Sequence, residues 1–421
     1  MSTSTVIAIP EGEGSVPLKE KKNKFRDSLL RIISFLGEKK NKDDVRKIIH
    51  SIKVGIALVL VSLLYLLDPL YKQVGENAMW AIMTVVVVFE FFAGALLSKG
   101  LNRGIGTILG GGLGCLAAAL AQGVGGVGNA IVIGTSVFIF GSAATYSRLI
   151  PSIKKRYDYG AMIFILTFNL VVVSGLRAER VLQLARERLC TIFMGFVVCI
   201  FTSLLVFPVW ASDDLHDSVT SKFDNLARSI EACSEEYFSI GNEKENQPKF
   251  SCSSCKSVLY SKSKDESLAN FARWEPWHGK FGFSYPWKKY LQIGEVLRDV
   301  AVATLSLKGC LRSPRQSSET LRASIKEACE EVACTLRELG ESIVKMRRCQ
   351  PAALLMPKLK SMRQELSLVV SPCTLGLLEN SDGVLEIASF VFTLMQIIDK
   401  VEELTKEVEE LGELAGFHAK K

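Results

Sequence analysis

Six apolar stretches crowd into the first half of this chain, and they constrain its fold more than any other feature. A helix needs about 20 mostly apolar residues to cross the hydrocarbon core of a bilayer. The stretches have about that length, and they run over residues 49–67, 79–98, 104–121, 130–147, 159–175 and 189–209. Because lipid offers no hydrogen bonds to an open backbone, the sequence predicts six transmembrane helices.

Beyond residue 210 the pattern changes to that of amphipathic helices in water. Apolar residues recur every three or four positions, as at Leu215, Val219 and Phe223 and again at Leu321 and Ile325. The predicted fold is therefore an all-α integral membrane protein, with six transmembrane helices followed by a cytosolic helical bundle. The expected parts are a cytosolic tail over 1–48, a transmembrane domain over 49–209 and a helical domain over 210–421 with a mobile loop near 241–267.

The distribution of charge predicts which side of the membrane each end faces. Lys and Arg are concentrated in the tail before the first span, at Lys99 and Arg103, and over residues 148–156. These three regions fall on one face, which the positive-inside rule makes cytosolic. An even number of spans then places both termini in the cytosol. The eleven cysteines lack the regular spacing of a secreted disulfide framework and are typical of reduced thiols.

The connection over residues 176–188 breaks the positive-inside rule, because it lies on the opposite face and yet holds four arginines. For Arg177 and Arg180, a solvated loop with local ion pairs accounts for the charge equally well. Arg186 and Arg188 differ because they stand at the mouth of the sixth span. A cation there either reaches out to the lipid headgroups or faces a water-filled vestibule. In the second arrangement, basic residues concentrate anions and repel cations.

A carboxylate, Glu90, interrupts the second apolar stretch. A charge at the centre of a bilayer costs at least about 2.5 kcal/mol, so an acid inside a span is a candidate functional residue. Glu90 either pairs with a base on a neighbouring helix and fixes the packing, or belongs to a gate or charge network along a pathway. Lys53, near the start of the first span, is its candidate partner.

The third stretch is dense in glycine, with Gly104, Gly106, Gly110, Gly111 and Gly114. Dinucleotide binding would require a preceding strand and a soluble βαβ unit, whereas here the preceding segment is a predicted membrane helix. Small residues let membrane helices approach closely, and this helix packing is the role predicted for the five glycines. An unwound segment whose backbone amides contact an anion is the alternative.

Other kinds of chemistry find little support in the sequence. Cys252 and Cys255 form a lone pair without a second ligand pair, and the four histidines lack metal-ligand spacing, so neither a metal nor a cofactor is predicted. No nucleotide-binding loop, hydrolase motif or metalloprotease motif is present, and we expect no enzyme activity. The net charge of +7 is modest for 421 residues and does not favour nucleic-acid binding.

Residues 271–281 combine aromatic and charged side chains without a helical pattern. The default interpretation is a structural corner that Trp274 and Trp277 hold together. The alternative is a regulatory contact with the transmembrane domain.

Several motifs together resemble the plant aluminium-activated malate transporter (ALMT) family of anion channels. They are Trp80-Ala-Ile-Met-Thr-Val-Val-Val-Val-Phe-Glu-Phe, Leu97-Ser-Lys-Gly-Leu-Asn-Arg-Gly, Tyr157-Asp-Tyr-Gly-Ala-Met-Ile-Phe-Ile-Leu-Thr-Phe, Phe207-Pro-Val-Trp-Ala and Trp274-Glu275-Pro276. The resemblance covers nearly everything after about residue 43. The chain departs from it at Phe92-Ala-Gly-Ala-Leu, where the family more often has Thr-Val-Gly-Ala-Thr with its hydroxyl groups.

This resemblance implies a homodimeric channel that passes malate and inorganic anions such as chloride or nitrate, with a pore domain over 49–209 and a regulatory domain over 210–421. The implied pore-lining residues are Lys99, Arg103, Arg186 and Arg188. The implied gating residues are Glu90, Trp274, Glu275 and Pro276. The lack of a long cysteine-rich N-terminal extension favours the plasma membrane over the vacuolar membrane.

Two other classes of function stay open at this point. Helices broken by glycine, together with Glu90 as a proton site, are compatible with a proton-coupled organic-anion exporter. A non-conducting membrane scaffold would instead use the helical domain for interactions with partners.

Overall fold

The computed structural model describes residues 42–66, 79–175, 181–239, 253–282, 285–309, 319–348, 352–369 and 381–418. Within these residues the regular structure is α-helix, apart from two isolated β-bridges, His278–Phe281 and Arg347–His418. Contacts divide the chain into two compact units. The first unit comprises residues 1–91 and 102–208, and the second comprises residues 92–101 and 209–421. The all-α class is therefore confirmed for the described residues.

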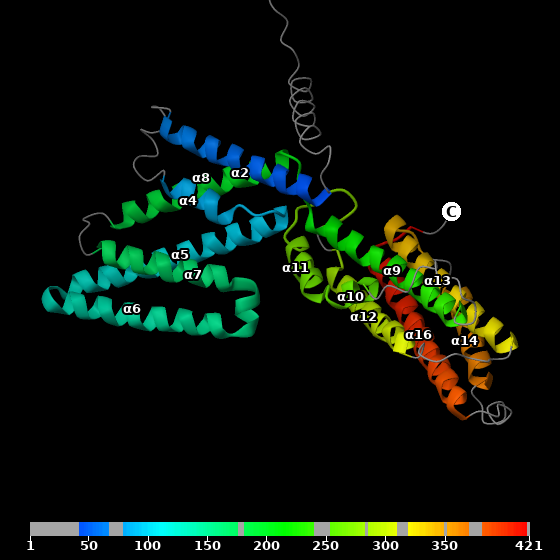
Figure 1. Ribbon diagram of the computed structural model, residues 1–421. Helices are drawn as coiled ribbons and strands as arrows, with labels where there is room; N and C mark the ends of the chain where they lie inside the picture. The colour runs from blue at the N-terminus through cyan, green and yellow to red at the C-terminus, as the bar shows by residue number, and fades with distance from the viewer. Residues whose placement is uncertain are drawn as a thin grey trace, which may run out of the picture. The chain divides into compact units, whose positions relative to one another are not determined.

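The first unit is built from helices that run in alternating directions along the chain (Figure 1). Their bounds are α2 Lys42–Leu66, α4 Met79–Val88, α5 Ala93–Val124, α6 Gly126–Leu149, α7 Pro151–Gly175 and α8 Val181–Leu205. Four of them, α5 to α8, contain stretches long and apolar enough to cross a membrane. Helix α4 is apolar but has only ten residues, about half the thickness of the hydrocarbon core. These helices make the chain a multi-pass membrane protein.

The second span expected over residues 79–98 is wrong in its extent. Helix α4 ends at Val88, and the chain breaks at Phe89–Phe92, so α5 runs without interruption through Lys99 and Arg103, where a connection was expected. The charge of Glu90 therefore lies in the break, partly exposed, and not in the middle of a helix. Hydropathy misses this turn because apolar residues continue on both sides of it.

Helix packing in the first unit depends on close approach between backbones. Helix α2 packs against α4 and α8, α4 packs against α8, and α6 packs against α7. A Cβ on Gly195 of α8 would lie 2.7 Å from the carbonyl oxygen of Ala81 on α4, so only glycine fits there. Gly110 makes the same kind of approach from α5 to α7, with its Cβ position 2.7 Å from the carbonyl oxygen of Phe164.

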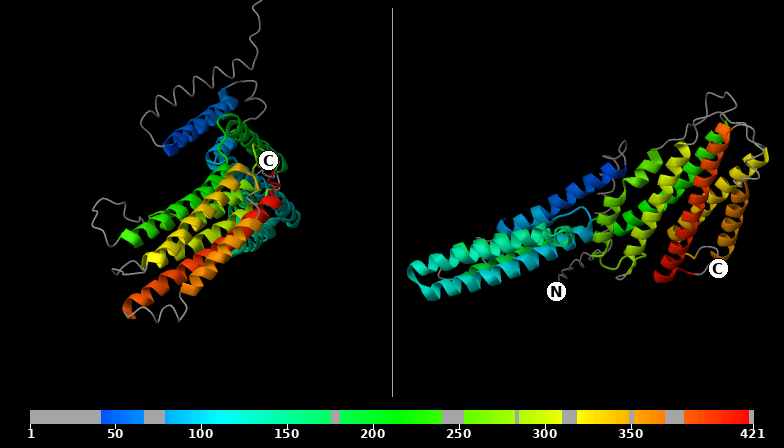
Figure 2. Two further views of the ribbon diagram at one scale, coloured as in Figure 1. Left: turned by 90° about the vertical axis from the view of Figure 1, so that its right-hand side faces the viewer. Right: turned by 90° about the horizontal axis from the view of Figure 1, so that it is seen from below.

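The second unit is a bundle of helices (Figure 2), and its buried apolar side chains form one continuous core. Its helices are α9 Ala211–Ser239, α10 Ser253–Leu259, α11 Lys262–Ala272, α12 Trp287–Gly309, α13 Glu319–Lys345, α14 Ala352–Val369 and α16 Ser381–Leu414. The mobile loop expected near 241–267 is wrong for its second half, which forms α10 and much of α11. Sparse apolar residues such as Cys255, Val258 and Leu268 are buried in the core and hold these helices in place. Residues 240–252 lie outside the described residues.

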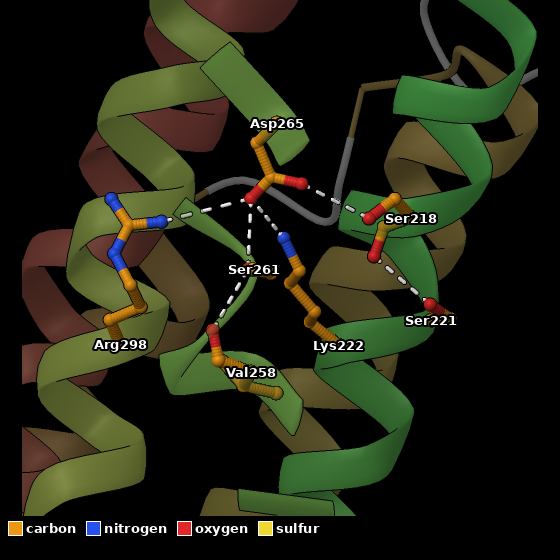
Figure 3. Close-up of polar contacts among 7 residues, drawn as sticks. All are labelled: Ser218, Ser221, Lys222, Val258, Ser261, Asp265 and Arg298. Carbon is orange, nitrogen blue, oxygen red and sulfur yellow. Dashed lines mark hydrogen bonds and ion pairs between the residues drawn. The ribbon is translucent and has the colours of Figure 1, made fainter. Parts of the chain in front are cut away.

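A buried charge cluster ties three helices of the second unit together (Figure 3). Asp265 of α11 accepts hydrogen bonds from Lys222 Nζ, from Ser218 Oγ at 3.2 Å and from Ser261 Oγ at 3.0 Å, and Arg298 of α12 lies 3.7 Å from the same carboxylate. Burial lowers the pKa of Lys222, and the hydrogen bond to Asp265 opposes that shift. Each charged side chain of this cluster therefore has an opposite charge within reach.

Candidate functional site

Three of the four predicted pore-lining residues converge on one cavity in the first unit. The cavity has a volume of about 450 Å³, and α4, α5, α7 and α8 form its walls. Arg103, Arg186 and Arg188 line it, and most of the remaining lining is apolar. Polar uncharged groups are also present, among them Thr107 and the thiol of Cys115. The cavity thus combines cationic side chains with mostly apolar walls.

Arg103 enters the cavity from the middle of α5. Its side chain is 93% buried, and its Nη1 donates a hydrogen bond to the hydroxyl of Tyr159 at 3.1 Å. The buried Nε of Arg103 has no partner among the described residues, and neither does the hydroxyl of Thr107 one turn later. Buried donors without partners are costly, so this end of the cavity is suited to an acceptor from outside the protein.

Arg188 stands on the opposite wall, on α8. Its guanidinium lies 4.9 Å from the centre of the Trp80 ring on α4, which is a cation–π distance. The Nε and Nη1 of Arg188 are buried and have no hydrogen-bond partner among the described residues. Arg186 is exposed on the same helix and lines the same cavity. The ring of Trp80 orients Arg188 without using its donors, since a π face accepts no strong hydrogen bond.

These cations suit an anion with oxygen atoms. A guanidinium presents a planar fork of donors that matches a carboxylate in two parallel hydrogen bonds. In an apolar cavity the same charges act more strongly on an anion than they would in bulk water. A small carboxylate or inorganic anion would therefore supply acceptors for Arg103 and Arg188.

The remaining predicted residues of α5 lie in different surroundings. Lys99 does not line the cavity, although it lies four residues before Arg103 and hence on the same helix face. A Cβ on Gly106 would collide with the carbonyl oxygen of Gly160, and a Cβ on Gly110 or Gly114 would lie 2.7 or 3.0 Å from atoms of α7. Gly104 has nothing within 4 Å of its Cβ position, and Gly111 lines the cavity.

Lys53 and Glu90 meet around a third residue, His50. Both charges act electrostatically on the His50 side chain, and the side chain of Lys53 is almost completely buried. The ring of His50 also contacts Phe89 and Phe91, with ring centres 5.8 and 5.4 Å apart. The three ionisable residues thus gather at the break between α4 and α5.

In the second unit, Glu275 is the centre of the Trp274-Glu275-Pro276 motif. Its carboxylate accepts hydrogen bonds from Ala211 N at 2.6 Å, Ser212 N at 3.2 Å and Ser212 Oγ at 2.6 Å, and so caps the first turn of α9. A Cβ on Gly94, in the first turn of α5, would collide with the carbonyl oxygen of Phe271 and lie 2.9 Å from Glu275 Cγ. Glu275 therefore joins the starts of α9 and α5.

The corner expected at residues 271–281 is present, but a different side chain holds it. Trp277 is 72% exposed and does not staple the corner, and Trp274 and Pro276 are partly exposed. His278 instead stacks on Trp210 with ring centres 3.7 Å apart and contacts Ser212 Oγ at 3.0 Å. A buried carboxylate and a histidine thus make contacts that hold this corner, and the prediction is wrong for Trp277.

Sequence reasoning missed four residues of these sites. Trp80 and Thr107 contribute to the arginine cavity, and Gly195 and Gly160 allow the close helix approaches around it. An isolated glycine in an apolar helix, as in Phe193-Met-Gly195, was the available signal for packing. Nothing local in the sequence pairs Trp80 with Arg188, because 108 positions separate them.

Comparison with known proteins gives consistent matches. The family model described as "Aluminium activated malate transporter" matches residues 39–382. The chain is 48% identical over 318 residues to aluminum-activated malate transporter 12 of Arabidopsis thaliana, covering 74% of this chain and 57% of that relative. It is 46% identical over 354 residues to transporter 14 of the same plant, covering 82% and 65%. Aluminum-activated malate transporter 1 of Triticum aestivum is 38% identical over 396 residues, covering 89% and 84%. The chain thus spans about three fifths of the length of the first two relatives.

Proposed function

Because the chain belongs to the aluminium-activated malate transporter family, we propose that it passes anions across a membrane through a pore lined by basic residues. Malate and inorganic anions such as chloride and nitrate are the proposed substrates, and two copies of the chain form the conducting assembly. Both termini face the cytosol in this proposal, and the plasma membrane is the proposed location. The family consists of transporters and not of enzymes.

One observation carries the proposal: three arginines share a cavity, and two of them hold buried donors that have no partner among the described residues. Taking an anion out of water costs its hydration shell, and guanidinium donors replace part of that shell. The apolar walls strengthen the electrostatic attraction of the anion, and the arginine charges repel cations. Three cations at one site also attract a divalent carboxylate more strongly than a monovalent anion.

Helix α5 offers a route by which the second unit acts on this cavity. Its first turns, residues 93–101, belong to the second unit, where Gly94 packs against the Glu275 corner. The same helix carries Arg103, Thr107 and Cys115 into the cavity two to six turns later. A helix transmits a rotation or shift along its axis, so a change at the Glu275 corner moves one wall of the cavity. This gives Trp274, Glu275 and Pro276 a gating role.

The test is a current recording from liposomes or cells that hold the full chain, with malate, chloride or nitrate as the only permeant anion. We expect anion currents in the wild type, loss of most current in Arg188→Glu, and partial retention in Arg188→Lys. Absence of any anion current in the wild type would refute the proposal. Normal current in Arg188→Glu would remove the cavity from the pathway.

The same recording separates a channel from a proton-coupled exporter. The cluster of His50, Lys53 and Glu90 is the observation that favours the exporter, because ionisable groups near a helix break are able to carry protons. A channel gives a reversal potential that follows the anion gradient alone. A reversal potential that shifts with the pH gradient at fixed stoichiometry, and that loses this shift in Glu90→Gln, would establish the exporter.

A further inference from the structure

We propose that a groove between α5, α6 and α7 in the first unit binds one anionic phospholipid. The groove has a volume of about 410 Å³ and shares no lining residue with the arginine cavity. Binding sites for small organic groups commonly measure about 300–1,000 Å³, so one acyl chain has room here. Apolar side chains dominate the lining, including Ile105, Leu109, Phe140, Ala143, Ala161 and Phe164.

Glycines and alanines create this groove. Gly106 of α5 and Gly160 of α7 bring the two backbones into contact, because a Cβ on Gly106 would collide with the carbonyl oxygen of Gly160. Both glycines line the groove, so backbone atoms form part of its surface. Ala143 and Ala144 keep the α6 wall shallow. The result is a mostly apolar groove that suits a hydrocarbon chain.

Cations stand at the end of the groove near the α6–α7 turn. Arg156 lies four residues before Gly160, and Lys154 lies three residues before Tyr157. Residues at these spacings share a helix face, so both cations lie one turn before a groove-lining residue of α7. Both side chains are exposed. Side chains on a helix tilt toward its N-terminus, which carries these two cations past the end of the groove toward the depth of lipid headgroups.

Basic residues outnumber acidic ones in the sequence of this turn. Asp158 is the sole acidic residue in the sequence from 148 to 158. Arg148 donates two hydrogen bonds to it, of 2.7 and 3.3 Å, so Lys154 and Arg156 are in excess over the acidic residues of this segment. The N-terminus of α7 adds partial positive charge at the same place. Basic groups between membrane helices beside an apolar groove select an anionic headgroup over a zwitterionic one.

Native mass spectrometry of the purified full chain tests the site directly, with phosphatidylglycerol and phosphatidylcholine titrated separately. We expect one phosphatidylglycerol to bind more tightly than phosphatidylcholine, and Arg156→Gln to weaken it about fivefold. Lys47→Gln removes the same charge from an exposed position on α2 and serves as the matched control. Ala143→Phe fills the groove and should abolish retention of the lipid, whereas Ser142→Phe, at an exposed neighbouring position outside the groove, should not.

Equal retention of the two lipids would overturn the proposal, as would equal effects of Arg156→Gln and Lys47→Gln, which would indicate a general attraction to the whole protein. Equal effects of Ala143→Phe and Ser142→Phe would also refute the groove. Ala161→Phe, on the α7 wall, fills the same space and replaces Ala143→Phe if that variant does not fold. The measurement records lipid binding and is independent of anion conduction.

Discussion

Two groups of buried or partly buried cations, one in each unit, differ in the partners that they have among the described residues. In the second unit, Lys222 and Arg298 surround Asp265, and serine hydroxyls complete its hydrogen bonds. In the first unit, Arg103 and Arg188 line a cavity with buried donors that have no partner among the described residues. The first arrangement holds a fold together, whereas the second costs folding energy and favours an anion from outside. Removing charges one at a time should separate these two roles.

The largest expected effect is on the partnered cluster. Asp265→Asn leaves Lys222 buried without its acid, and breaking a buried ion pair in this way costs about 3–5 kcal/mol. The thermal midpoint of the full chain in detergent should fall by many degrees. Asp299→Asn is the control, because Asp299 pairs with Lys400 at the surface, where such pairs contribute about 0–1 kcal/mol. Equal shifts in the two variants would show that Asp265 is not a structural centre.

The pH dependence of Asp265→Asn sharpens this result. Burial already lowers the pKa of Lys222, and the variant removes the hydrogen bond that opposes the shift. A lysine with a lowered folded-state pKa is penalised while charged, and raising the pH through that pKa relieves the penalty. The deficit in thermal midpoint of Asp265→Asn relative to wild type should therefore be smaller at pH 10 than at pH 7. A constant deficit would contradict this account.

A smaller loss is expected at the Glu275 corner, where a second buried carboxylate of this unit is held by hydrogen bonds. Glu275→Gln keeps the shape but weakens three hydrogen bonds to the start of α9, with an expected cost of about 1–3 kcal/mol. The voltage or ligand dependence of the anion current should also change, since the same side chain contacts Gly94 of α5. Glu295→Gln, at an exposed position on α12, should change neither the thermal midpoint nor the current.

The sequence predicts the all-α class and the positions of the cavity arginines, because both depend on local sequence patterns. Long apolar stretches locate α6, α7 and α8, although α7 and α8 begin eight residues earlier than the predicted spans, and arginines beside such stretches are conspicuous. The break at Phe89–Phe92 is not visible, since a turn between two apolar helices changes packing and not hydropathy. The buried role of Glu275 depends on Ala211, 64 positions away. Contacts of this kind come from tertiary packing, which no local pattern contains.

Selective labelling of a natural cysteine thiol should detect the positive charge of the arginine cavity. Cys115 lines the cavity, whereas Cys190 is exposed on α8 and does not line it. An anionic thiol reagent should modify Cys115 about tenfold faster than a cationic reagent of the same size, because a cavity of one charge sign concentrates its counter-ion. At Cys190 the two reagents should react at similar rates. Peptide mass mapping after short exposures gives both rates in one sample, and equal rates at Cys115 would argue against a cationic cavity.

Arg103→Met should have the smallest effect on stability and the clearest effect on function. A methionine has similar length without a charge, so the variant removes a buried cation whose Nε has no described partner. A buried charge carries a desolvation cost that packed apolar atoms do not carry. The thermal midpoint should stay the same or rise, although the hydrogen bond to Tyr159 is lost, while the anion current should fall severalfold. Arg103→Lys keeps the charge and should keep part of the current. A large loss of stability in Arg103→Met would place Arg103 in the same class as Lys222, and the distinction between the two units would fail at that residue.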